Sequence, residues 1–476
     1  MMQILNGAYV VIAVILLFGA AVFVHEFGHY WMARRRGMKV EAFAIGFGPK
    51  ILGWNRDGIE YSWRWIPAGG FVKLPQMITS EALEGSSSGV PIPPASPWSR
   101  ILVAFAGPAM NVVFAFAVAG IIYFVGLPVP ATPPVVGFVE PQSEEAKAGI
   151  QDGDVIVMAA GKKVKYWEDL QSITILAPTN VLPVMTVRSV PGPGGVTNSV
   201  TNTFYLHTKV NEVFGLKMLN LDPRDHPEIH RVLAGGAAAE AGLAAGDEVV
   251  SVGDIPVVGQ TQFVDLIKKR GGKPTEIVVK RSGQRKAIQV TPRTDPTTGI
   301  GRIGVEVGTK SAGVYRILKP GPSPWAQVMD VWDKTVNTFS ALAHSKQTGV
   351  GAKDLSGPLG ILAMLGAQAQ ADYRLALSFL VLLSINLAII NLLPVPVLDG
   401  GHILIALIER VRGRPVSVKL LEYTTTGFAV LLISFMLYVS FFDVKRFPVF
   451  KSMFGRGIQI EQPENPADNP APAPAR

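Results

Sequence analysis

The sequence lacks cysteine and is poor in charge. None of its 476 residues is cysteine, which excludes disulfide bonds and thiolate metal sites, so a bound metal ion would need histidine and carboxylate ligands. Only 17% of the residues are charged and 48% are hydrophobic, a balance typical of membrane proteins. The net charge of +8 does not indicate nucleic-acid binding, because the basic residues cluster beside apolar segments. We therefore expect membrane lipid, and no nucleic acid, among the partners.

Charge is absent from four long stretches. They lie at residues 5–25, 101–127, 375–398 and 423–442, and each is close to the ~20 residues that cross a bilayer as a helix. The first has no basic region before it and no small-residue cleavage site, so we expect a retained anchor. Lysine and arginine follow the first stretch and separate the third from the fourth, which places both connections in the cytoplasm. The N-terminus and residues 128–374 should then lie outside.

The predicted outer segment contains an internal repeat. Residues 148–164 align with residues 241–257, and a Gly-Asp pair stands at the same place in both copies. Each copy is followed by a short helical pattern, "YWEDLQSI" and "TQFVDLIKK", which predicts two small β-rich modules. The pattern resembles tandem bacterial PDZ domains, which bind an extended peptide at a strand edge. Two structural β-domains that bind nothing would give the same pattern.

The end of the first apolar stretch carries the motif H-E-x-x-H, formed by His25, Glu26 and His29. Residues four apart share one face of a helix, so both imidazoles can bind one zinc ion. Glu26 lies next to them, near enough to take a proton from a water at the metal. A glutamate near the end of a membrane helix is costly and usually functional, which favours a catalytic site.

A catalytic zinc ion needs a third protein ligand and one open position. Asp399 is the first charged residue after the third apolar stretch, and the predicted topology places it on the same side as the histidine pair. Pro394 and Pro396 break the helix before it, and broken backbone at membrane depth is tolerated where it lines a cavity. We therefore predict that Asp399 completes the metal site beside a pocket.

These motifs together resemble the site-2 protease family of intramembrane metalloproteases. They are "HEFGH" in the first apolar stretch, "AGPAMN" (106–111) in the second and "NLLPVPVLDG" (391–400) in the third. Two PDZ-like modules between the second and third narrow the resemblance to the regulator of sigma-E protease type. Residues 58–74, with an expected turn at Gly69-Gly70, are similar to the membrane-associated β-loop of the family, and residues 354–361 also resemble family sequence.

The resemblance implies the roles of seven residues: Glu26 as catalytic base; His25, His29 and Asp399 as Zn²⁺ ligands; and Asn391, Pro394 and Pro396 as substrate-binding residues. It implies cleavage in or near the membrane helix of a single-span protein such as an anti-sigma factor, already trimmed by a site-1 protease. The location would be the bacterial inner membrane, with the modules on the periplasmic side and zinc near the cytoplasmic face. We hypothesise that the modules gate access and admit only trimmed substrates.

The expected fold is a polytopic α-helical membrane protein with four transmembrane helices, two extramembrane PDZ-like domains and the β-loop. The expected order is membrane core 1–127, first PDZ domain 128–220, second PDZ domain 221–310, linker 311–374, membrane core 375–460 and disordered tail 461–476. Residues 323–345 in the linker predict an amphipathic helix, either at the outer membrane surface or on an ordinary protein surface. A polar insert at 79–96 is expected to form a flexible cytoplasmic loop.

Other readings are weaker. His226 and His230 also stand four apart, but Glu228 lies on the wrong face, so no metal site is expected there. His402, one turn after Asp399, could contact the metal ligands or only pack at a helix start. A non-catalytic PDZ-bearing scaffold would bind no stoichiometric zinc, and a transporter would be expected to carry inverted repeats, of which none is found.

Overall fold

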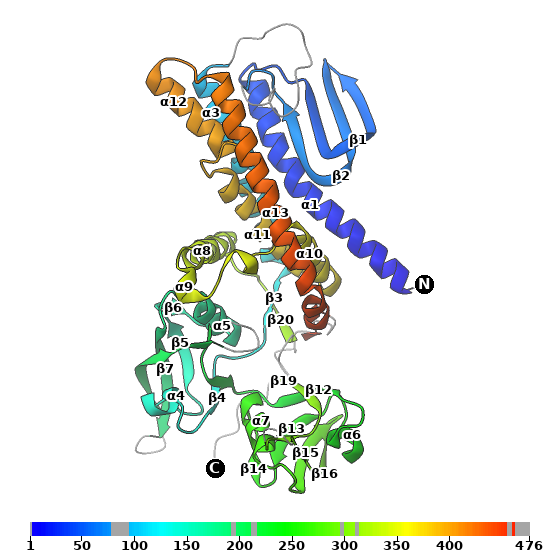
Figure 1. The fold of residues 1–476 in the computed structure, drawn as a ribbon, viewed down its shortest axis with the longest axis vertical. Helices are drawn as coiled ribbons and strands as arrows, with labels where there is room; N and C mark the ends of the chain where they lie inside the picture. Colours follow the sequence, from blue (N-terminus) through cyan, green and yellow to red (C-terminus); the bar gives the residue numbers. More distant parts are fainter. Residues whose placement is uncertain are drawn as a thin grey trace. The chain divides into compact units, whose positions relative to one another are not determined.

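The computed structural model (Figure 1) describes residues 2–77, 95–191, 197–210, 217–295, 299–309, 314–454 and 459–461. The predicted tail beyond 461 and nearly all of the 79–96 insert lie outside these residues. The chain divides into two compact units. The first comprises Met1–Pro128, Ile317–Val336 and Ala352–Gly457, and the second comprises Val129–Arg316, Asn337–Gly351 and Ile458–Arg476.

Long apolar helices form the first unit. The long helices are α1 (Met2–Arg35), α3 (Pro97–Val125), α11 (Tyr373–Asn391) and α13 (Val418–Phe454), and the shorter ones are α10 (Pro358–Ala371) and α12 (Asp399–Arg412). Each of the four long helices contains a segment long and apolar enough to cross a membrane, and each predicted apolar stretch falls on one of them. The third ends at Asn391 rather than at 398, because a residue before proline is disfavoured in a helix and Pro394 follows.

Helix α3 is the centre of this unit and packs against α1, α11 and α12. Its start is well defined, since Ser96 caps the helix by accepting the Ser99 N–H and Pro97 occupies the first turn. Small side chains line its contact with α1, where Ala115 and Ala119 belong to the same buried cluster as Ala21. Close helix packing of this kind brings functional groups on α1 and α3 within hydrogen-bonding distance.

The expected β-loop is an antiparallel ribbon of β1 (Ala42–Arg56) and β2 (Ile59–Lys73). Its tight turn is Asp57-Gly58, where both residues have positive φ, as a two-residue hairpin turn requires. Residues 60–63 and residues 70–73 of β2 both pair with residues 42–45 of β1, one segment on each side. The β2 strand therefore reverses direction between these two segments, near the turn predicted at Gly69-Gly70. Residues 70–73 therefore form an outer edge of this small sheet. This edge borders the cavity described below.

The second unit contains the two predicted β-rich modules. The first is built from α4 (Glu144–Ala148), α5 (Trp167–Leu176) and a sheet in the order β6-β5-β7-β8, in which β5 is Val155–Ala159, β6 is Lys162–Lys163, β7 is Val181–Pro191 and β8 is Thr197–His207. The second has α6 (Ala237–Ala241), α7 (Gln260–Lys268) and a sheet in the order β16-β15-β13-β12-β19. Its strands are β12 (Pro227–Val232), β13 (Glu248–Val252), β15 (Thr275–Arg281), β16 (Gln284–Val290) and β19 (Val305–Thr309). Both predicted helices are confirmed as α5 and α7.

The repeated Gly-Asp pair marks a repeated ion pair. Asp154 and Asp247 are fully buried, and each accepts from an arginine Nε at 2.6 Å, Arg188 in the first module and Arg281 in the second. Both guanidinium groups also donate to a backbone carbonyl, of Gly149 and of Gly242. A buried carboxylate needs such partners, so the repeat preserves a structural unit of the fold.

Another buried carboxylate gives the family-like segment 354–361 a structural role. Asp443 on α13 is 2% exposed and accepts the N–H of Gly357 at 3.2 Å and of Gly360 at 2.9 Å. These groups lie at the start of α10, where backbone N–H groups have no helical partner. A Cβ on Gly357 or on Gly360 would lie 2.7 Å from the Asp443 carboxylate, so a side chain at either position would displace that carboxylate. The segment therefore fastens α10 to α13.

The predicted amphipathic helix is present as α8 (Pro324–Ala343). Val328 and Val331 are buried, whereas Trp325 and Trp332 are 66% and 48% exposed. This helix has two distinct faces, and its position at a membrane surface stays a prediction.

Candidate metal centre

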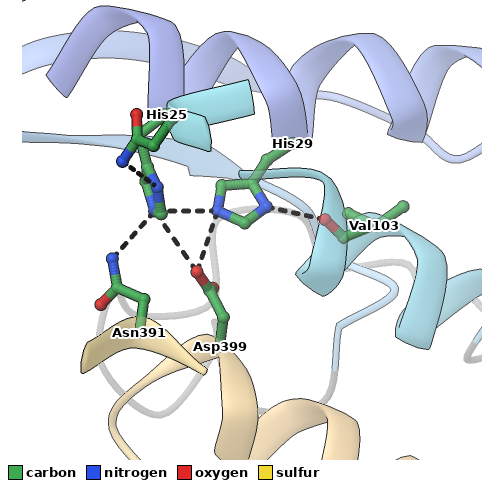
Figure 2. Close-up of polar contacts among 6 residues, drawn as sticks. His25, His29, Val103, Asn391 and Asp399 are labelled. Carbon is green, nitrogen blue, oxygen red and sulfur yellow. Dashed lines mark hydrogen bonds and ion pairs between the residues drawn. The ribbon is translucent and has the colours of Figure 1, made fainter. Parts of the chain in front are cut away.

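The site begins on α1, where His25 and His29 lie one helical turn apart. Asp399, the first residue of α12, meets them from the far end of the sequence (Figure 2). The Asp399 Oδ2 atom lies 3.3 Å from His25 Nε2 and 3.4 Å from His29 Nε2, and the two Nε2 atoms are 3.2 Å apart. The three predicted ligands therefore form a nearly equilateral triangle.

This triangle has the dimensions of a zinc site. Ligands about 2.0–2.1 Å from a tetrahedral zinc ion are about 3.3–3.4 Å from one another. Asp399 Oδ2 is buried and has no hydrogen-bond donor, as expected for an atom reserved for a metal ion. Within the described ranges, no other cluster of three His, Asp or Glu side chains could hold a metal ion, and the His226/His230 pair is not part of one. Two imidazoles and one carboxylate leave a fourth position open.

The charge state of the carboxylate also fits a metal ligand. Burial alone would raise the pKa of Asp399, but His29 and His25 outweigh burial and hold that pKa below its usual range. The carboxylate is therefore ionised at neutral pH, which is the form that binds a metal ion.

Neighbouring groups orient the two histidines. His29 Nδ1–H donates to the carbonyl oxygen of Val103 on α3 at 2.8 Å (Figure 2), which leaves Nε2 for a metal ion. Asn391 Nδ2, at the end of α11, lies 3.4 Å from His25 Nε2. Asn111 Nδ2 lies 3.3 Å from His25 Nδ1. Sequence reasoning assigned no role to Val103 or Asn111, although Asn111 closes the "AGPAMN" motif.

Two glycines allow α1 and α3 to approach closely enough for these contacts. A Cβ on Gly28, inside the H-E-x-x-H motif, would lie 2.4 Å from the Ala106 carbonyl oxygen. A Cβ on Gly107 would lie 2.2 Å from His29 Nε2. The helices therefore cross at backbone-to-backbone distance, and neither position has room for a side chain.

Gly107→Ala is expected to weaken zinc binding at least about tenfold, because the His29 ring would have to leave the ligand triangle. The measurement is zinc per purified chain after dialysis against a weak chelator. Gly120→Ala on the same helix is the matched control, since its Cβ meets no atom within 4 Å. If Gly107→Ala retained zinc as well as Gly120→Ala, the close approach would not matter for the metal site.

A cavity of about 450 Å³ lies beside the triangle. Its wall includes Glu26, the three metal-ligand candidates, Asn391 and the β2 segment 69–72. Apolar side chains complete the wall, among them Leu387, Val397 and Leu398. The predicted base therefore faces the same space as the open metal position, and the edge of β2 forms the other side.

The proline turn directly precedes the cavity-lining residues Val397 and Leu398. Pro394 and Pro396 lie in the connection between α11 and α12, and neither is among the cavity-lining residues, so a direct role in substrate binding stays a prediction. A Cβ on Gly400 or Gly401 would lie 2.3 Å from the Leu393 oxygen or 2.2 Å from the Val395 oxygen. The turn thus packs tightly onto the start of α12 and fixes the position of Asp399.

His402, one turn after Asp399, also lines the cavity. Burial lowers the pKa of His402 below the ordinary histidine value, so its imidazole is neutral at physiological pH. Both expectations for His402, contact with the metal ligands and packing at a helix start, stay predictions.

Comparison with known proteins gives one consistent result. The model of peptidase family M50 matches residues 13–435. A "putative zinc metalloprotease" of Vibrio cholerae is 33% identical, with 91% of this chain and 98% of that protein aligned. "Regulator of sigma-E protease RseP" is 31% identical in Salmonella typhimurium and 30% in Escherichia coli, over 91% of this chain and 98% and 97% of those proteins.

Among solved structures, the PDZ domain of an SdrC-like protein from Listeria monocytogenes aligns with 17% of this chain and 87% of that domain. The sequence identity is 20% and the TM-score is 0.16, a likeness too slight to support an argument.

Proposed function

Because this chain belongs to peptidase family M50 and is therefore a metalloprotease, we propose that it cleaves membrane proteins with a zinc ion held by His25, His29 and Asp399. The observation that carries the proposal is the ligand triangle, with edges of 3.2–3.4 Å, facing a cavity at the end of a membrane-length helix. A water-using metal site in such a place serves substrates that are themselves in the membrane.

The residues around the cavity divide the chemistry between them. When bound, zinc supplies the Lewis acidity that activates water and polarises the scissile carbonyl. Glu26 takes the proton of the attacking water and passes it to the leaving amine. Val103 holds the His29 ring in place, and the Asn391 amide beside His25 can contact the substrate backbone.

The edge of β2 suggests how a helical substrate is presented. Peptide groups in a helix are hidden in their own hydrogen bonds, so cleavage requires a locally unwound segment. Residues 70–73 pair with 42–45 on one side and line the cavity through residues 69–72. An unwound substrate segment can add to this edge as an extra strand, which would hold it extended beside Glu26.

The charge distribution supports a proposed membrane topology. The α1 helix ends in Arg34 and Arg35, so we infer that the metal site lies near the cytoplasmic face of the bacterial inner membrane, with both modules outside. The predicted division into membrane core 1–127, PDZ domains 128–220 and 221–310, linker 311–374 and membrane core 375–460 is part of this proposal. The relatives named for sigma-E regulation suggest a single-span anti-sigma-like substrate, trimmed beforehand by a site-1 protease.

The modules are proposed to gate the site. Removal of residues 135–309 is expected to let an untrimmed single-span substrate be cut as fast as its trimmed form, because the obstacle to a bulky outer domain is gone. The measurement compares cleavage of one substrate with and without its outer domain, by intact and deleted enzyme in the same vesicles. The deleted enzyme carrying Glu26→Gln controls for other proteases. If the deletion enzyme still rejected the untrimmed substrate, the gate would have to lie elsewhere.

A further inference from the structure

Asn111 is a buried amide whose oxygen has no hydrogen-bond donor. It lies on α3 and is completely shielded from solvent. Its Nδ2 atom is 3.3 Å from His25 Nδ1, while its Oδ1 atom is buried without a hydrogen-bond donor. A buried amide usually satisfies both of its ends, so this arrangement calls for a physical reason.

The reason lies in the two nitrogens of His25. Its Nε2 atom is the one that faces His29 and Asp399 and would bind the metal ion. A neutral imidazole that binds a metal through Nε2 carries its proton on Nδ1, and that N–H needs an acceptor. The oxygen and nitrogen of an amide are nearly equal in size, and a half-turn of the Asn111 amide exchanges them. After that half-turn, Oδ1 faces the His25 Nδ1–H and accepts a hydrogen bond from it, while Nδ2 takes the place that Oδ1 held.

We propose that Asn111 is a positioning residue, whose Oδ1 accepts the His25 Nδ1–H and thereby keeps Nε2 free for zinc. Val103 does the same for His29 with its backbone carbonyl. Both acceptors come from α3, so this helix orients both imidazoles of α1 although it supplies no metal ligand itself. The inference rests on the zinc site of the proposed function.

The test measures zinc affinity of the full-length protein in detergent by competition with a chromophoric chelator. Asn111→Leu keeps the size of the side chain and removes the acceptor, so zinc should bind about 10–100-fold more weakly. Asn111→Asp keeps an acceptor oxygen and should bind zinc nearly as tightly as wild type. Asn386→Leu is the control, because it removes a membrane-core amide that bonds Thr335 on α8 and does not contact the ligands.

Each outcome has one meaning. Wild-type affinity in Asn111→Leu would overturn the inference, and so would an Asn111→Asp variant as weak as the leucine variant, because Asn111 would then act as a donor. If Asn111→Leu does not fold, the zinc affinity of Asn111→Asp is compared with that of wild type, and a clear loss would overturn the inference. A wild-type protein that bound no zinc would instead refute the proposed function, independently of Asn111.

Discussion

Glu26→Gln is expected to slow proteolysis by about 10²–10⁴-fold, the usual contribution of a general acid–base residue, and to leave zinc content unchanged. Glutamine has the shape of glutamate but cannot accept a proton from the attacking water. Glu26 packs closely against the edge of β2, since a Cβ on Gly70 would lie 2.8 Å from Glu26 Cγ. A same-sized replacement should therefore preserve the cavity and change only the chemistry.

The measurement pairs a cleavage assay on a trimmed single-span substrate with metal analysis of the same preparations. Glu60→Gln on β2 is a suitable control, because Glu60 forms an ion pair with Lys50 at 2.6 Å and does not line the cavity. It should retain wild-type activity. A fully active Glu26→Gln enzyme would remove Glu26 from the mechanism.

Asp399→Asn should differ from Glu26→Gln in its zinc content, because it should lose zinc as well as activity. The neutral amide keeps the size of the carboxylate but removes the negative charge beside His25 and His29. Removing one of three protein ligands should weaken zinc binding by at least about 10–100-fold, the loss seen even for outer-shell partners. Chelation of the wild-type enzyme should reproduce the inactive state, and added zinc should restore activity to wild type but not to the variant.

Asp372→Asn provides the control for this experiment. Asp372 caps the start of α11 by accepting the Arg374 N–H at 2.7 Å, so it tests helix stability without touching the metal ligands. It should purify with one zinc per chain. Undiminished zinc in Asp399→Asn would exclude Asp399 as a ligand, and a wild-type protein without zinc would favour a non-catalytic PDZ-bearing scaffold.

The clustering of His25, His29 and Asp399 was predictable because the motifs that contain them are short and strongly constrained. His25 and His29 are four apart in an apolar helix, and Asp399 is the first charge after another apolar stretch. The same apolar pattern predicted the helices. No local sequence feature indicates that the α1 histidines meet Asp399 of α12. Only the predicted topology, which places the end of α1 and the start of α12 on the same side of the membrane, linked them.

Other features depend on pairings that a sequence does not display. The acceptor for His29 is the backbone oxygen of Val103, and any residue type can supply a carbonyl. The partners of Asp154 and Asp247 are arginines on later strands, Arg188 and Arg281, which look like ordinary surface charges in the sequence. The double pairing of β2 also escaped prediction, because strand register depends on neighbours and not on local propensity.

The distance between the two halves of the metal site along the chain has a consequence for synthesis. About 370 residues separate His29 from Asp399. At about 5–20 residues per second, a ribosome needs about 20–70 s to reach the aspartate after the histidines have emerged. During that interval the growing chain has two imidazoles, no carboxylate ligand and no α12. With the proposed ligand set, we expect a nascent chain, or a chain truncated before residue 399, to have no proteolytic activity.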